Sequence, residues 1–171
     1  MQFPRSAGQP AAMPLREPAN LVARRALWFW TVRAGVPWLA VLAAELGLVL
    51  NLDGPASRWL IPAATAVLGA AHVLVMPQWR YRVHRWEASP SAVYTQSGWF
   101  NQERRIAPLS RIQTVDTERG PLEQLFGLSN VTVTTASAAG PLRINGLARR
   151  TADQLVTELT EATAATTGDA T

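Results

Sequence analysis

The chain has 171 residues, of which 48% are hydrophobic, and its formal net charge is +4. Cysteine is absent, which excludes disulfides, thiol catalysis and zinc–thiolate sites. Residues 34–77 carry three formal charges, whereas residues 79–171 carry ten arginines and nine acidic residues. This split excludes an ordinary soluble single domain. The basic excess is not clustered in the water-soluble part, so we expect no nucleic-acid partner.

The first half of the chain predicts a membrane anchor. Residues 1–19 are rich in proline and predict a disordered cytoplasmic tail, and residues 20–27 predict a short interfacial lead. Two apolar stretches follow, at residues 28–50 and 59–77. As helices they are about 35 Å and 29 Å long, enough to cross a hydrocarbon core of about 30 Å. The short loop between them predicts a tight hairpin, so we assign residues 20–78 to the lead and two transmembrane helices.

The distribution of arginine predicts the orientation of this hairpin. Arginines lie in the N-terminal flank of the first stretch, counted up to Arg33, and after the second: Arg16, Arg24, Arg25, Arg33, Arg80, Arg82 and Arg85. The loop carries only Arg58, which is offset by Asp53. The positive-inside rule therefore predicts a two-span protein of the cell membrane with both termini in the cytoplasm. Four tryptophans lie near the expected interfaces, as an aromatic belt requires: Trp28, Trp30, Trp59 and Trp79.

Two polar side chains, Glu45 and His72, fall inside the predicted spans. Their depths differ by about 12 Å, which argues against a direct proton relay, and we expect a structural role for both. Small residues recur at four-residue spacing in both stretches, as in Ala43 and Gly47 or Thr65 and Gly69. Such faces pack closely, either between the two helices or against another membrane protein.

From residue 79 the sequence changes to short alternating segments, which are typical of β-strands. The expected strands cover residues 79–86, 92–97, part of 99–106, 111–118, 131–136 and 142–145. A slip in the alternation between Ile112 and Val115 predicts a bulge. A helix beginning near Thr151, with a capping box to Gln154, closes the chain. We therefore expect an antiparallel barrel or sandwich of six or seven strands over residues 79–165, capped by this helix, and a disordered tail at 166–171.

Residues 104–138 resemble the signature of bacterial membrane proteins that carry a YdbS-like pleckstrin-homology (PH) domain. The matching positions are Ile106, Pro108, Ile112, Gln113, Val115, Gly120, Pro121, Leu122, Leu125, Phe126, Gly127, Leu128, Val131, Val133, Thr135 and Ala136. The chain departs from the family at Gln124, where a basic residue is often found. The resemblance implies a PH-like fold, a bent seven-stranded sheet capped by a C-terminal helix, that acts mainly by binding lipids or proteins.

The motif residues also have a structural interpretation. Gly120 and Pro121 predict a turn, and Leu122, Leu125 and Phe126 predict one helical turn packed on the sheet. Gly127 then ends this turn at a position that favours a positive φ. We expect structural roles for these ten motif residues: Pro108, Ile112, Val115, Gly120, Pro121, Leu122, Leu125, Phe126, Gly127 and Leu128.

The sequence contains no GxSxG, HExxH, Walker A or GxGxxG pattern, so we expect no catalysis, no cofactor and no metal. Candidate contacts to anionic lipid are basic residues on strand faces below the membrane: Arg80, Arg82, His84, Arg104 and Arg105. Trp99 and Phe100 are candidates for insertion into the interface. In the competing interpretation the first arginines only fix the topology, and the two aromatic side chains belong to the core.

These observations predict a membrane-anchored binding module at the cytoplasmic face. The favoured function is that of an adaptor or accessory subunit that binds a membrane or cytoplasmic protein, or a second copy of itself. Binding to an anionic lipid surface is the alternative, and transport or channel activity is the less favoured third.

Overall fold

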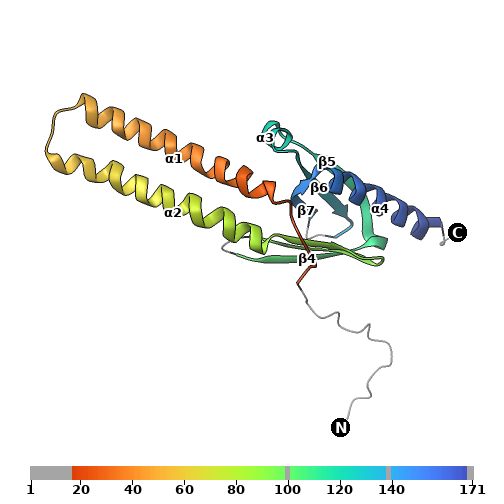
Figure 1. Ribbon diagram of the computed structural model, residues 1–171. Helices are drawn as coiled ribbons and strands as arrows, with labels where there is room; N and C mark the ends of the chain where they lie inside the picture. Colours follow the sequence, from red (N-terminus) through yellow and green to blue (C-terminus); the bar gives the residue numbers. More distant parts are fainter. Residues whose placement is uncertain (1–16, 99–100, 138–139, 169–171) are drawn as a thin grey trace, which may run out of the picture.

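A computed structural model describes residues 17–98, 101–137 and 140–168. Helices α1 (Arg25–Asn51) and α2 (Leu60–Val83) form a long antiparallel hairpin that projects from a β-domain (Figure 1). The 3-10 turn η1 (Ala56–Trp59) leads into α2. Few residues of either helix are buried, and both helices are long and apolar enough to cross a membrane. The predicted helical hairpin is confirmed, although its helices extend beyond residues 28–50 and 59–77.

Polar side chains and a glycine join the two helices of the hairpin. The indole N–H of Trp38 donates a hydrogen bond to Nδ1 of His72 over 2.8 Å. The hydroxyl of Thr65 donates to Oε1 of Glu45 over 2.9 Å. A Cβ at Gly69 would lie 3.1 Å from the Trp38 ring, so glycine allows this close approach. Both intramembrane polar residues therefore bridge α1 and α2.

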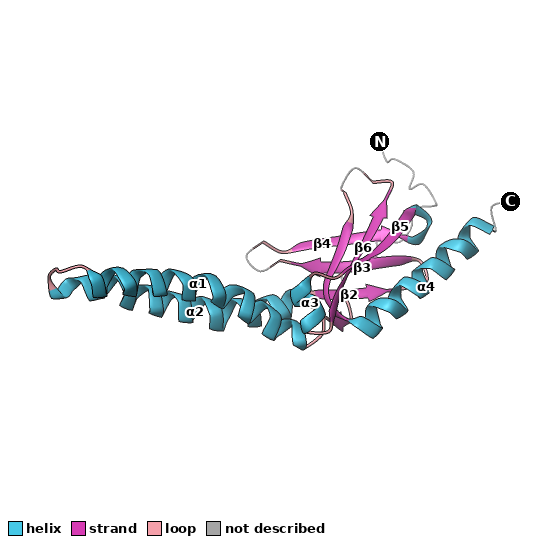
Figure 2. Ribbon diagram, turned by 90° about the horizontal axis from the view of Figure 1, so that it is seen from above, coloured by secondary structure: helices cyan, strands magenta, loops and turns pink. Residues whose placement is uncertain are grey.

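The β-domain consists of two antiparallel sheets. One has the order β1-β2-β3-β4: β1 (Asn20–Leu21), β2 (Arg85–Ala88), β3 (Ala92–Ser97) and β4 (Glu103–Pro108). The other has the order β5-β6-β7: β5 (Ile112–Glu118), β6 (Leu128–Thr135) and β7 (Leu142–Ala148). The turn η2 (Leu109–Arg111) precedes β5, and α3 (Pro121–Leu125) precedes β6. Helix α4 (Arg149–Gly168) follows β7 and lies along the sheets (Figure 2).

The main core lies between the two sheets and α4. Its fully buried side chains include Val93, Val131, Val133 and Leu155. The inward positions of Val131 and Val133 agree with the alternation of their segment. The register of β5 shifts between Ile112 and Thr114, where a bulge is predicted. The predicted sandwich of about seven strands with a C-terminal helix is thus confirmed.

Three local predictions are wrong. Residues 79–83 are not part of a strand, because α2 continues to Val83 and packs into the β-domain before β2 begins at Arg85. Residues 20–21 do not lie in a simple interfacial lead but form β1, which pairs with β2. Helix α4 begins at Arg149, directly after β7, so Thr151 lies inside the helix and does not cap it.

Candidate functional site at the joint between hairpin and sheets

A second hydrophobic core fastens the base of α1 to the β-domain. Val22, Ala26, Phe29 and Trp30 are buried there against Leu128 of β6. Partly buried side chains from several elements pack around them: Ala23, Tyr81, Trp86 and Phe126. Burial of each large apolar side chain contributes about 1.5–3 kcal/mol, so this joint is a substantial contact and not a flexible tether.

Backbone contacts reinforce the joint on the N-terminal side of α1. Asn20 and Leu21 of β1 pair with Trp86 and Arg85 of β2. The N–H of Ala23 then donates to the carbonyl of Gly146 in β7 over 3.0 Å. Gly146 has a φ of +80°, and a Cβ there would lie 3.0 Å from the Cβ of Ala26. The segment before the hairpin is therefore bonded to both sheets.

Three side chains pack together at the end of α2. The guanidinium carbon of Arg80 lies 4.6 Å from the centroid of the Trp30 ring. The centroid of the His84 ring lies 5.1 Å from the centroid of the same Trp30 ring. The Nδ1–H of His84 donates to the Arg80 carbonyl over 2.8 Å. Burial, with a smaller contribution from the Arg80 charge, lowers the pKa of His84 to about 4. A neutral His84 therefore marks the end of the helix.

The basic residues predicted to contact lipid do not share one strand face. Arg80 and Arg82 belong to α2, with Arg80 half-buried in the joint and Arg82 exposed, while His84 is buried. The predicted common strand face is wrong because this segment is helical. Arg104 and Arg105 lie on β4, as expected. Contact of these residues with lipid stays a prediction, and Trp99 and Phe100 lie outside the described residues.

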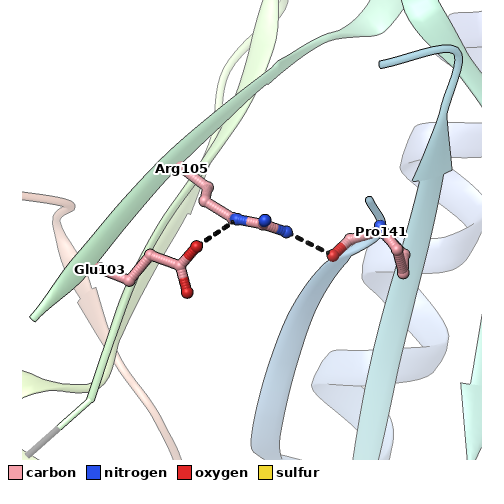
Figure 3. A network of polar contacts seen from close by, with 3 residues as sticks. All are labelled: Glu103, Arg105 and Pro141. Atoms are coloured by element: carbon pink, nitrogen blue, oxygen red, sulfur yellow. Dashed lines mark hydrogen bonds and ion pairs between the residues drawn. The ribbon is translucent and has the colours of Figure 1, made fainter. Parts of the chain in front are cut away.

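Arg105 holds β4 against the loop before β7. Its Nε donates to Oε1 of Glu103 over 2.7 Å, and its Nη1 donates to the carbonyl of Pro141 over 2.7 Å (Figure 3). Beside this bridge lies a groove of about 350 Å³, lined by residues of β4, β6 and β7 that include Arg104, Ile106 and Leu142. Ile106 is 45% exposed and lies on the same face of β4 as Arg104. The groove combines charge with an accessible apolar side chain.

The motif residues form the turn that the sequence predicts, but its apolar contacts differ. Gly120 precedes α3, and Gly127 has a φ of +64°. The Phe126 ring packs edge-on against Phe29 of α1, with 6.1 Å between the centroids. Leu122 and Leu125 are 43% and 79% exposed, so their predicted packing on the sheet is wrong. The remaining motif residues lie at the end of β4, in β5, in α3 and at the start of β6: Pro108, Ile112, Val115, Pro121 and Leu128.

The joint is not predicted from the sequence. The only local indication of it is the helical spacing of Val22, Ala26, Phe29 and Trp30. This spacing is equally typical of the start of a lipid-facing helix. The structure places Trp30 in the joint and not in the aromatic belt, whereas Trp28, Trp59 and Trp79 are exposed. Within the described parts of the chain, no three His, Asp or Glu side chains are grouped as a metal site would require.

Comparisons with known proteins match most of this architecture. Residues 34–163 match the model of the family described as bacterial PH domain. The chain is similar to the UPF0699 transmembrane protein YdbS of Bacillus subtilis (strain 168). The two are 32% identical over 128 residues, which covers 71% of this chain and 79% of that protein. No solved structure matches the chain.

Proposed function

The chain belongs to the bacterial PH-domain family, and we propose that it is a membrane-anchored docking module for a protein partner at the cytoplasmic face. The observation that carries this proposal is the joint, in which Trp30, Phe29 and Leu128 fasten the β-domain to the hairpin. A domain held this way keeps a fixed height and orientation above the bilayer. Rigid attachment to the hairpin suits an adaptor or accessory subunit, because it lowers the orientational entropy lost when a partner binds.

The groove beside β4 is the surface we assign to the partner. It offers the exposed side chain of Ile106 next to the charged side chain of Arg104. An apolar contact flanked by charge is the common composition of a protein interface. β4 is also the last strand of its sheet in the described parts of the chain, so a partner segment can approach a sheet edge there. A non-enzymatic role is part of this proposal.

Site-specific photo-cross-linking in the native membrane tests the docking surface. A benzoylphenylalanine at position 106 is expected to give a discrete protein adduct, whereas the same probe at Thr160, exposed on α4, gives none. Arg104→Glu should lower the yield of the adduct, and Arg150→Glu, an equal charge change on α4, should not. An adduct with a second copy of the chain assigns the groove to a homo-oligomer. Only lipid adducts, or equal protein adducts at both positions, would contradict the proposal.

The orientation is tested separately with introduced cysteines, since the chain has none of its own. In intact cells, a membrane-impermeant maleimide should label Ser57→Cys, which lies in the turn η1 between the two helices. It should label Thr160→Cys only after the cells are broken. The opposite pattern would place the β-domain outside and would remove the cytoplasmic partner from consideration.

A further inference from the structure

One side of the hairpin contains a groove with a basic mouth and an apolar floor. Its volume is about 280 Å³, and it lies between α1 and α2 where they approach the β-domain. Arg33 and Arg80 line it at the end nearer the sheets, and Pro37, Trp38 and Met76 line it farther along the hairpin. The exposed rings of Trp28 and Trp79 lie at the same end of the two helices. The mouth is therefore at the level of the lipid headgroups.

The positive charges at this mouth have no counterion among the residues that the structure describes. No acidic side chain in the described residues forms an ion pair with Arg33 or Arg80. The two arginines line the same groove of about 280 Å³, so their like charges repel each other. The face of Arg80 stacks on Trp30, but stacking leaves the N–H groups at the edge of a guanidinium able to donate. An anion between the two arginines would relieve the repulsion and accept their hydrogen bonds.

We propose that this groove binds an anionic phospholipid from the leaflet on the side of the β-domain. The lipid phosphate lies between Arg33 and Arg80, and an acyl chain follows the apolar floor along Pro37, Trp38 and Met76. Arginine suits this ligand because its planar fork matches two phosphate oxygens. Basic pockets between transmembrane helices are a general mode of lipid headgroup binding. This site is separate from the β4 groove, so it does not depend on the proposed protein partner.

The apolar floor distinguishes a lipid from a free phosphate. A soluble phosphate could meet the two guanidinium groups but would leave the surface of Trp38 and Met76 uncovered. A phospholipid covers both parts of the groove at once. The lipid is already concentrated in the leaflet that surrounds the hairpin, so its binding loses less translational freedom than that of a solute.

Native mass spectrometry of the full-length protein in neutral detergent tests this proposal. Phosphatidylglycerol is added in competition with phosphatidylcholine, and glycerol phosphate serves as the soluble competitor. Arg33→Gln should weaken retention of phosphatidylglycerol about fivefold, since each arginine near anionic lipid contributes about 1 kcal/mol. The control Arg24→Gln removes the same charge from an exposed position at the start of α1, outside this groove, and should change retention less than about twofold.

Arg33 is exposed, so its substitution is expected to leave the fold intact, which an unchanged thermal midpoint confirms. Arg80→Gln is a second variant for the same site. Its retention of phosphatidylglycerol is compared only if its thermal midpoint is also unchanged. Equal losses in Arg33→Gln and Arg24→Gln would overturn the proposal in favour of diffuse charge. Equal retention of phosphatidylcholine, or displacement of phosphatidylglycerol by glycerol phosphate, would also overturn it.

Discussion

The His84 side chain links the end of α2 to Trp30, and its protonation should weaken the fold. Its pKa is about 4 in the folded chain and about 6.5 in an unfolded one, so the unfolded state binds more protons between these values. Stability contributed by neutral His84 is therefore present above pH 6.5 and is lost as the pH falls toward 4, by at most about 1.4 kcal/mol per pH unit. Thermal unfolding of the full-length protein in detergent at pH 7.5 and 5 measures this loss. His84→Gln should show a smaller loss between the two pH values, and an equal loss would contradict the assignment.

Gly146 and Gly140 provide a matched pair for testing the close contact in the joint. Both have a positive φ, +80° and +78°, so alanine is strained by the backbone at either position. Only at Gly146 would the new Cβ meet Ala26, at 3.0 Å, whereas the space around Gly140 is open. Gly146→Ala should therefore lower the free energy of unfolding by about 1–3 kcal/mol more than Gly140→Ala does, because the new Cβ overpacks the joint. Denaturant unfolding of the two variants measures this difference. Equal shifts would mean that α1 does not press on β7.

At the scale of elements, β1 is expected to protect the edge of β2. It contributes only two residues, but Val22 directly after it is buried in the joint. Deleting residues 1–22 should accelerate amide hydrogen exchange in β2 (85–88) and leave the central strand β6 protected. Deleting residues 1–16 serves as the control, because it leaves β1 in place. Unchanged exchange in β2 after the longer deletion would show that β1 does not hold this edge.

The elements that the sequence predicts well are those with a local pattern. The two apolar runs, the alternation of Val131 and Val133, and the apolar spacing of α4 each identify an element without knowledge of its neighbours. β1 could not be predicted this way, because its pairing with β2 joins residues on opposite sides of the hairpin. The alternation at Trp79, Tyr81 and Val83 suggests a strand, but α2 continues to Val83, with Tyr81 packed in the joint and Val83 buried.

In the candidate site too, features with a local sequence pattern could be predicted, and contacts between distant segments could not. The turn at Gly127 could be predicted from residue type, and its φ of +64° agrees with that prediction. The contact of Phe126 with Phe29 could not, because nothing in either segment indicates the other. The lipid groove likewise depends on Arg33 and Arg80 meeting across two helices. Sites that arise from tertiary contacts between distant segments are not readable from local periodicity.

For the whole molecule, the joint implies that the β-domain depends on the hairpin. A fragment of residues 79–171 lacks β1 and retains only the last turn of α2. It would also expose Leu128 and Trp86, which pack against α1 and the preceding segment in the intact chain. We expect this fragment to lose the near-ultraviolet circular dichroism that arises from packed Trp86, whereas the full-length protein in detergent retains it. A native-like signal from the fragment would mean that the domain folds without its anchor.

The central claim is that the hairpin and the β-domain form one rigid body. Because cysteine is absent, Leu68→Cys on α2 and Thr160→Cys on α4, both exposed, provide two unique sites for spin labels. Pulsed electron paramagnetic resonance of the doubly labelled protein in lipid nanodiscs then measures the distance across the joint. We predict a single narrow distance distribution that broadens when Trp30→Ala removes the centre of the joint. A broad distribution with Trp30 in place would contradict the claim, because it would mean that the β-domain moves freely on its anchor.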